Sequence, residues 1–379
     1  MVINKLFRIL FIISISLLTG GCLDKYDAPI SENKIGYLVI DGFINTTSKT
    51  ATVKLSRAIS LSASEAFPTV GNATVIVEGE DGSTTTLIER PKGIYELTSS
   101  VFANPTRFRL KTILNDGMQY ESDFIQPLVT PPIDSITWKP NQNGITVYVN
   151  THNDIDQTKF YKWNFTETWS YSAQYFSYFN LQNGEAFIRK PEEYIYDCYS
   201  KEKSSAIIIG STVRLSKNAV RNLPLTAINK ESRKLFQRYS ILVEQRSLDA
   251  DAYNYWNNLQ KSSENLGGLF DPLPSQVTGN IRNTGDDKDP VFGYFSAGTV
   301  EQQRLFISFS ELPSYLRSIK YNLCEVVKVP LKDLGNLASQ NVLLEAYGQP
   351  VIEGYTATTY ECADCRTYGG TTTKPDFWP

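Results

Sequence analysis

Short runs of alternating apolar and polar residues, separated by turn residues, occupy most of the chain. Between residues 35 and 130 the sequence forms about seven such segments, each of a length typical of one strand. Asp81-Gly82 and Asp116-Gly117 each join two neighbouring segments, and such pairs favour the positive φ angles of a tight hairpin turn. This spacing predicts an antiparallel β-sandwich domain over residues 35–130, immunoglobulin-like or transthyretin-like.

Thr130-Pro131-Pro132 marks the predicted domain boundary, and strand-like patterns continue beyond it. One segment differs, because residues 247–266 place apolar side chains on one stripe at helical spacing. Ser247 is its candidate N-cap and Gly267 its stop. The stripe consists of Leu248, Ala252, Tyr255, Trp256 and Leu259. We therefore expect residues 131–379 to form a second β-rich domain with one clear α-helix.

The N-terminus combines positive charge with an apolar run. Lys5 and Arg8 precede about ten apolar residues, which suits the core of a signal peptide, whereas a bilayer span needs roughly 20. Small residues then lead up to Cys22. We expect residues 1–21 to be a cleaved secretory signal peptide.

Thr19-Gly20-Gly21-Cys22 resembles the lipobox of bacterial lipoproteins, in which the cysteine is acylated, for example with palmitate, and becomes the mature N-terminus. Residues 22–34 are polar, contain Pro29 and predict a tether between lipid and folded protein. The expected location is therefore a membrane, reached through Cys22. The alternative is an ordinary secretory signal with a cysteine near its cleavage point.

Charge and length limit the class of protein. The chain has 379 residues and a formal net charge of −3, and the predicted signal peptide holds Lys5 and Arg8, so the mature chain would be more acidic. An acidic chain without long basic runs argues against nucleic acid as a partner. Its length is typical of two domains, each with its own core.

Four cysteines remain if Cys22 is acylated: Cys198, Cys324, Cys362 and Cys365. An even number in an oxidising compartment predicts two structural disulfides, with three pairings open. We expect Cys362 and Cys365 each to pair with one of the distant cysteines. A zinc site would need a second close pair, and a redox pair would open a helix, which the glycines and threonines after Cys365 oppose.

Two aromatic residues, Phe377 and Trp378, stand at the chain end. Chain ends fray unless they are packed. We expect both side chains to pack into the folded protein beside the cysteine cluster.

No catalytic constellation is recognisable, so we expect neither enzymatic activity nor a cofactor nor a metal. His152 is the only histidine, it lies in a polar loop, and the chain contains no nucleophile elbow. Carboxylates cluster twice without matching a calcium loop, and we interpret both clusters as polar turns. The clusters are Asp154 with Asp156, and Asp286 with Asp287 and Asp289. A carboxylate-based hydrolase is the enzyme alternative.

One uncharged stretch, residues 169–180, is crowded with aromatic side chains. Tyrosine and tryptophan favour interfaces, because they combine a large apolar area with a polar atom. We interpret the stretch as a candidate binding surface, with burial in the core as the alternative. Its aromatic members are Trp169, Tyr171, Tyr175, Phe176, Tyr178 and Phe179.

Several unusual strings occur in one order: RYSILVEQRSLDADAYNYWNNLQ, GGLFDPLPSQVTGNI, PVFGYFSA and CADCRTYGGTTTKPDFW. With the candidate lipobox, this order resembles a family of Bacteroidota lipoproteins known as domain of unknown function 4249 (DUF4249). The resemblance implies an outer-membrane lipoprotein, often encoded beside TonB-dependent transporters. It brings no catalytic residues.

From this resemblance we expect a lipid-anchored binding accessory of a TonB-dependent transporter in the outer membrane. It would sit at the cell surface, with the periplasmic face as the alternative, and would act as a lid or capture a small molecule, a peptide or a glycan. A surface adhesin or an envelope structural lipoprotein is the second hypothesis, and the sandwich domain suits it equally well.

Overall fold

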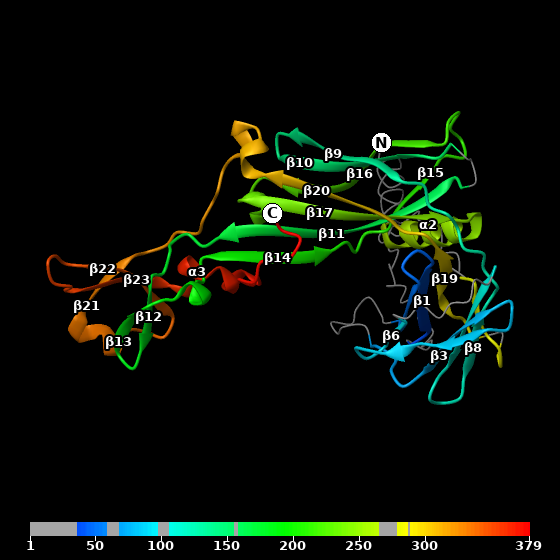
Figure 1. Ribbon diagram of the computed structural model, residues 1–379, viewed down its shortest axis with the longest axis horizontal. Coiled ribbons are helices and arrows are strands. Elements are labelled where there is room, and N and C mark those ends of the chain that lie inside the picture. The colour runs from blue at the N-terminus through cyan, green and yellow to red at the C-terminus, as the bar shows by residue number, and fades with distance from the viewer. Residues whose placement is uncertain (1–35, 59–67, 98–105, 155–157, 265–278, 287–288) are drawn as a thin grey trace, which may run out of the picture.

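The computed structural model describes residues 36–58, 68–97, 106–154, 158–264, 279–286 and 289–379. Within these ranges the fold is mainly β, as the sequence predicts. Figure 1 shows an elongated molecule with two bodies and a projecting third part. We call them the N-terminal body, the central body and the arm.

Two five-stranded sheets form the N-terminal body, in the orders β19-β1-β2-β6-β5 and β18-β8-β7-β3-β4. Successive side chains on a strand face opposite sides, so every second residue, such as Val53 and Leu110, enters one shared core. The strands are β1 (Leu38–Asn45), β2 (Thr50–Arg57), β3 (Thr74–Gly79), β4 (Thr84–Thr86), β5 (Ile88–Glu89), β6 (Ile94–Leu97), β7 (Phe108–Ile113), β8 (Gln119–Ser122), β18 (Ile281–Asn283) and β19 (Phe292–Gly298).

Strands β18 and β19 join this body from late in the sequence. β18 pairs with β8, and β19 runs parallel to β1, with Val39 opposite Phe292. Gly293 permits the close approach, because its φ is +123° and a Cβ atom there would lie 1.8 Å from the carbonyl oxygen of Ile40. The predicted second domain, residues 131–379, therefore contributes two strands to the N-terminal body. The pair of β1 and β19 is parallel, whereas the sequence predicted an antiparallel sandwich.

The central body contains a sheet of order β16-β10-β9 and a second of order β14-β11-β17-β20, with β15 also paired to β11. The two sheets share a core around Trp163, whose Nε1 donates to Gln245 Oε1 at 2.8 Å. The strands are β9 (Ile133–Asn141), β10 (Gly144–His152), β11 (Phe160–Ser172), β14 (Asp197–Lys203), β15 (Ile208–Ser211), β16 (Ala219–Asn229), β17 (Arg238–Leu248) and β20 (Glu301–Ser308).

Helix α2 (Ala250–Glu264) packs against both bodies. Ala252 and Tyr255 are buried with Leu248 of β17 and Tyr294 of β19, so the predicted apolar stripe is a core face. The predicted cap is corrected: Ser247 is still in β17, and the Oδ1 of Asp249 accepts from the backbone N of Ala252 at 2.7 Å. β17 runs on to Leu248, so the helix begins later than its pattern suggests.

The arm projects from the central body (Figure 1). A hairpin of β12 (Phe179–Gln182) and β13 (Glu185–Ile188) packs on a sheet of β21 (Val327–Pro330), β23 (Gly354–Thr359) and β22 (Asn341–Tyr347). The arm has its own small core, in which Phe179 and Leu181 pack against Leu343 and Tyr355. It also contains α3 (Tyr360–Ala363), and short 3₁₀ helices occur here and elsewhere, at Pro191–Glu193, Arg233–Leu235, Phe309–Glu311, Ser314–Leu316, Leu331–Asn336 and Cys365–Tyr368. Of the helices in the described ranges, none has the length and apolar character required to cross a membrane.

Candidate functional site: the apolar arm and its root

Two disulfides hold the root of the arm. Cys198 of β14 pairs with Cys365, and Cys324 pairs with Cys362 of α3. The prediction of two disulfides is confirmed, with Cys362 and Cys365 each reaching back to a distant cysteine. Since all four cysteines are bonded in these two pairs, their sulfur atoms serve as covalent links in this fold.

The chain end packs beside this cluster. The Trp378 ring is 8% exposed and lies edge-on to Tyr199 of β14 at 5.5 Å and to Phe306 of β20 at 5.6 Å. Phe377 is 41% exposed, and the Arg304 guanidinium lies 3.6 Å from its ring centroid. The packing expected for the chain end therefore holds for Trp378, while Phe377 stays at the surface.

The predicted aromatic surface at 169–179 is divided between core and surface. Tyr171 is fully buried, and its hydroxyl donates to the carbonyl oxygen of Cys365 at 3.1 Å. Phe179 packs against Tyr355 in the arm, and Trp169 and Tyr175 are half-buried. Tyr178, in contrast, is 46% exposed. Most of the run is at least partly buried, because β11 is a central strand of its sheet and leads directly into the arm.

Half-buried Phe176 gathers other aromatic rings at the root of the arm. Its ring centroid lies 4.5 Å from that of Tyr178, 5.0 Å from Tyr194 and 5.2 Å from Tyr196. Phe176, Tyr194 and Tyr196 line a hollow of about 240 Å³, which Tyr199 and Lys374 also line. Tyr194 and Tyr196 come from a segment that the sequence analysis left unassigned, because only the fold brings them to Phe176.

A buried cation fixes the arm hairpin to the sheet behind it. Arg189 follows β13, and its Nε donates to the Oγ of Ser177 at 3.0 Å. The Ser177 hydroxyl donates in turn to the carbonyl oxygen of Leu343 in β22 at 2.7 Å. Burial lowers the pKa of Arg189 from its ordinary value. These contacts hold the hairpin in a fixed position, so its outer face is presented as part of one rigid arm.

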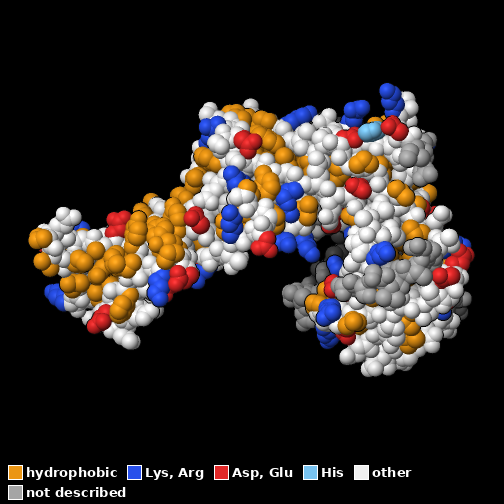
Figure 2. Space-filling view, in the orientation of Figure 1, with side chains coloured by type: hydrophobic (Ala, Val, Ile, Leu, Met, Phe, Trp, Pro, Cys, Tyr) orange, Lys and Arg blue, Asp and Glu red, His pale blue; other side chains and the backbone are white. Residues whose placement is uncertain are grey.

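The arm exposes several large apolar side chains. Ile188 is 75% exposed and Phe187 47%, and Leu323 is fully exposed. In Figure 2, hydrophobic side chains gather along the arm, whereas elsewhere on this face they are more scattered. We define the apolar arm surface by its exposed large hydrophobic residues: Tyr178, Phe187, Ile188, Tyr194, Leu323, Val326, Val327, Leu331, Val351, Ile352 and Tyr360.

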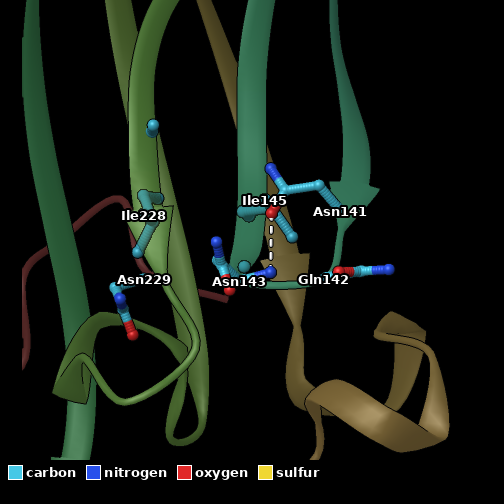
Figure 3. Close-up of a pocket in the computed structure, with 8 residues that line it drawn as sticks. Asn141, Gln142, Asn143, Ile145, Ile228 and Asn229 are labelled. Carbon is cyan, nitrogen blue, oxygen red and sulfur yellow. Dashed lines mark hydrogen bonds between the residues drawn. The ribbon is translucent and has the colours of Figure 1, made fainter.

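Other hollows carry less chemistry. A hollow of about 580 Å³ lies where the β9–β10 turn meets the end of β16, and Figure 3 shows its amide side chains. The Oδ1 of Asn141 accepts from the backbone N of Asn143 at 2.8 Å, and the Oδ1 of Asn229 accepts from the backbone N of Glu231 at 2.9 Å. Its lining residues include no titratable side chain, and these amides stabilise turns.

The carboxylate clusters behave as polar turns in the part of the chain that is described. Asp289 Oδ2 accepts from the Nδ2 of Asn283 at 3.1 Å and from the Tyr120 hydroxyl at 3.4 Å, beside a hollow of about 1200 Å³. Asp156 and Asp287 lie outside the described residues. Among those described, no three His, Cys, Asp or Glu side chains converge as a metal site would require.

His152 belongs to a small ionic cluster on the central body. Its Nδ1 lies 2.6 Å from Asp134 Oδ1, and its Nε2 lies 3.5 Å from Asp154 Oδ2. The hydrogen bond and charge of Asp134 raise the pKa of His152, with a smaller contribution from Asp154. The ring is half-exposed, so these contacts make it a surface ion pair.

Comparison with known proteins identifies a family. The model of the family described as "Domain of unknown function (DUF4249)" matches residues 24–304. No curated protein matches the chain. Two solved structures are similar: a DUF4785 family protein from Legionella pneumophila, at 9% identity over 53% of this chain and 49% of its own, with a TM-score of 0.19, and a DUF3823 family protein from Bacteroides ovatus, at 11% identity over 56% and 91%, with a TM-score of 0.15. This chain thus covers about half of the Legionella protein.

Proposed function

This chain belongs to the DUF4249 family, and we propose that it is a lipid-anchored, non-enzymatic binding protein of the outer membrane that docks on a TonB-dependent transporter. One observation carries the docking: the concentration of exposed apolar side chains on the arm, with Ile188 75% exposed. Large exposed apolar patches are typical of protein contact sites. The class of partner comes from the resemblance to lipoproteins encoded beside such transporters.

The arm suits a docking role because the apolar side chains that it exposes are not members of its own small core. Leu343, Tyr355 and Ala357 are buried on its inner side. Two disulfides and Arg189 fix its position. A partner would therefore meet a preorganised surface, which lowers the entropy lost on binding.

The first strand of the chain, β1, and the arm lie at opposite ends of the molecule. Cys22 and the tether at 22–34 fall outside the described residues, but the chain continues directly into β1 of the N-terminal body. Figure 1 shows that body at the far end from the arm. This separation favours a protein held by lipid at one end and bound to its partner at the other.

Affinity purification from the native outer membrane tests this proposal. The full-length acylated protein is isolated in mild detergent, and co-purifying proteins are identified by mass spectrometry. We expect a TonB-dependent transporter in stoichiometric amount. The double variant Phe187→Ser/Ile188→Ser should reduce its recovery about tenfold, because apolar contacts at the centre of an interface dominate affinity.

The chain offers a matched control on the central body. Val213 and Leu215 are 52% and 55% exposed and lie away from the arm, so Val213→Ser/Leu215→Ser changes apolarity to a similar extent. This control should recover the transporter like the wild type. Recovery of the lipoprotein alone, or equal recovery with both double variants, would contradict docking through the arm and favour the adhesin or envelope-structural alternative.

A further inference from the structure

A groove with aromatic and polar sides crosses the root of the arm. Asp197 and Tyr199 of β14 point to the same side of their strand and line two hollows at once, one of about 240 Å³ and one of about 490 Å³. Phe176 and Tyr194 line the first, and Trp378 lines the second. We propose that this groove is an oligosaccharide-binding site.

The first argument is the arrangement of rings. Tyr194 is 38% exposed, and its edge-to-face contact with Phe176 holds it at the surface of the groove. Tyr199 is held in the same way by Trp378. A pyranose has one face of C–H groups, and a fixed aromatic ring offers a matching apolar surface with a phenol oxygen at its edge. Tyr194 and Tyr199 therefore provide aromatic platforms for sugar units in the hollow that Asp197 also lines.

The second argument is the polar group that lines the same hollow as these platforms. Asp197 Oδ1 accepts from the Ser172 hydroxyl at 2.6 Å and from Gln237 Nε2 at 3.2 Å. These bonds fix the carboxylate and leave Oδ2 as an acceptor for a ligand hydroxyl. Ser310 and Arg238 line the same side and add donors. A polyol needs both donors and acceptors, and the groove supplies both.

The third argument is charge and length. Glu192 and Asp197 are balanced along the groove by Lys374 and Arg238, so the site does not select for a cation as an acidic aromatic cage would. The two hollows are neighbours, because Asp197 and Tyr199 line both of them. An extended, nearly neutral groove with aromatic platforms therefore fits an oligosaccharide better than a basic peptide or a small cation.

Isothermal titration calorimetry tests the site on the full-length acylated protein. The detergent is octaethylene glycol monododecyl ether, which carries no sugar headgroup. The probes are maltohexaose, cellohexaose, xylohexaose and chitohexaose, with hexalysine as the basic peptide. We expect one oligosaccharide to bind. Tyr194→Ala and Asp197→Asn should each weaken that binding about tenfold, since each removes a central contact.

Tyr315→Ala is the matched control, because Tyr315 is 57% exposed and does not line either hollow. It should bind like the wild type, and thermal melts verify that every variant is folded. Binding of none of the four oligosaccharides, unchanged binding by both groove variants, or tighter binding of hexalysine would overturn the proposal.

The oligosaccharide site depends on the proposed function in one respect, which is the delivery of a captured sugar to the transporter. Phe187 and Ile188 do not line the groove, so the arm variant should lose the transporter and keep oligosaccharide binding. Failure of one proposal therefore leaves the other testable.

Discussion

Cys198 and Cys365 are 167 positions apart in the sequence, and their sulfur atoms are joined in a buried disulfide. Cys198 belongs to the central body, and Cys365 follows helix α3 of the arm. The Tyr171 hydroxyl donates to the carbonyl oxygen of Cys365, so a hydrogen bond reinforces the covalent link. The disulfide and the hydrogen bond together fix the position of the arm on the central body.

The double variant Cys198→Ala/Cys365→Ala should lower the free energy of unfolding by about 4 kcal/mol, because a long chain loop would lose its closure. Urea unfolding followed by tyrosine and tryptophan fluorescence measures the change. The cysteines of the second disulfide are 38 positions apart, so Cys324→Ala/Cys362→Ala should lower the free energy of unfolding by less in the same assay. Equal or reversed costs would show that loop length does not determine the stabilisation.

Trp378→Ala should lower the free energy of unfolding by about 3 kcal/mol, since it removes a buried ring packed between β14 and β20. Phe377→Ala is the neighbouring control and should cost less than about 1 kcal/mol, because that ring is largely exposed. Thermal melts report both. A Trp378→Ala melt that matches the wild type would mean that the chain end does not stabilise the fold.

As the single histidine, His152 allows a clean pH measurement. Asp134 raises its pKa above 6.5 in the folded protein, so the pair stabilises the fold fully below pH 6.5 and loses this contribution as pH rises through the folded pKa. The imidazole proton resonance should titrate above 6.5 by NMR. Asp134→Asn should move the midpoint back towards 6.5, and an unmoved midpoint would exclude Asp134 as the cause.

Local patterns predicted the β-rich class, the helix stripe and the two disulfides, because each depends on spacing or on compartment. They did not predict the return of β18 and β19 to the N-terminal body. Val39 and Phe292 pair across more than half of the chain, and nothing in either segment names its distant partner. Composition alone also could not separate Tyr171, which is buried, from Tyr178, which is exposed.

The groove was missed for a related reason. Phe176 belonged to the predicted aromatic surface, but Tyr194 and Asp197 come from a second stretch of sequence and Trp378 from a third. Single aromatic and acidic residues at such positions are ordinary, and they form a site only after the arm folds back on β14. Besides the aromatic stretch that contains Phe176, the aromatic residues at the chain end were the only sequence signal for this site.

Lys162 is a partly buried lysine at the junction of the two bodies. Its Nζ lies 3.0 Å from the centroid of the Trp256 ring, and Arg246 lies directly opposite it on β17. Burial lowers the pKa of Lys162 to about 7, Asp41 opposes this change, and Arg246 and Lys54 add to it. The side chain therefore loses its proton more readily in the folded protein than in the unfolded chain.

This difference predicts how stability depends on pH. Between about pH 7 and the ordinary lysine pKa of 10.5, the unfolded chain binds more protons, so the free energy of unfolding should rise with pH. The contribution of Lys162 is at most about 1.4 kcal/mol per pH unit. Urea unfolding of the wild type and of Lys162→Met from pH 7 to 9 measures it.

Lys162→Met keeps an apolar stem against Trp256 and should flatten the rise, while Lys139→Met on an exposed position should keep the wild-type dependence. Parallel pH curves for the wild type and Lys162→Met would mean that Lys162 holds its proton in the folded state. Solvent or a counter-ion would then have to compensate the charge at the junction.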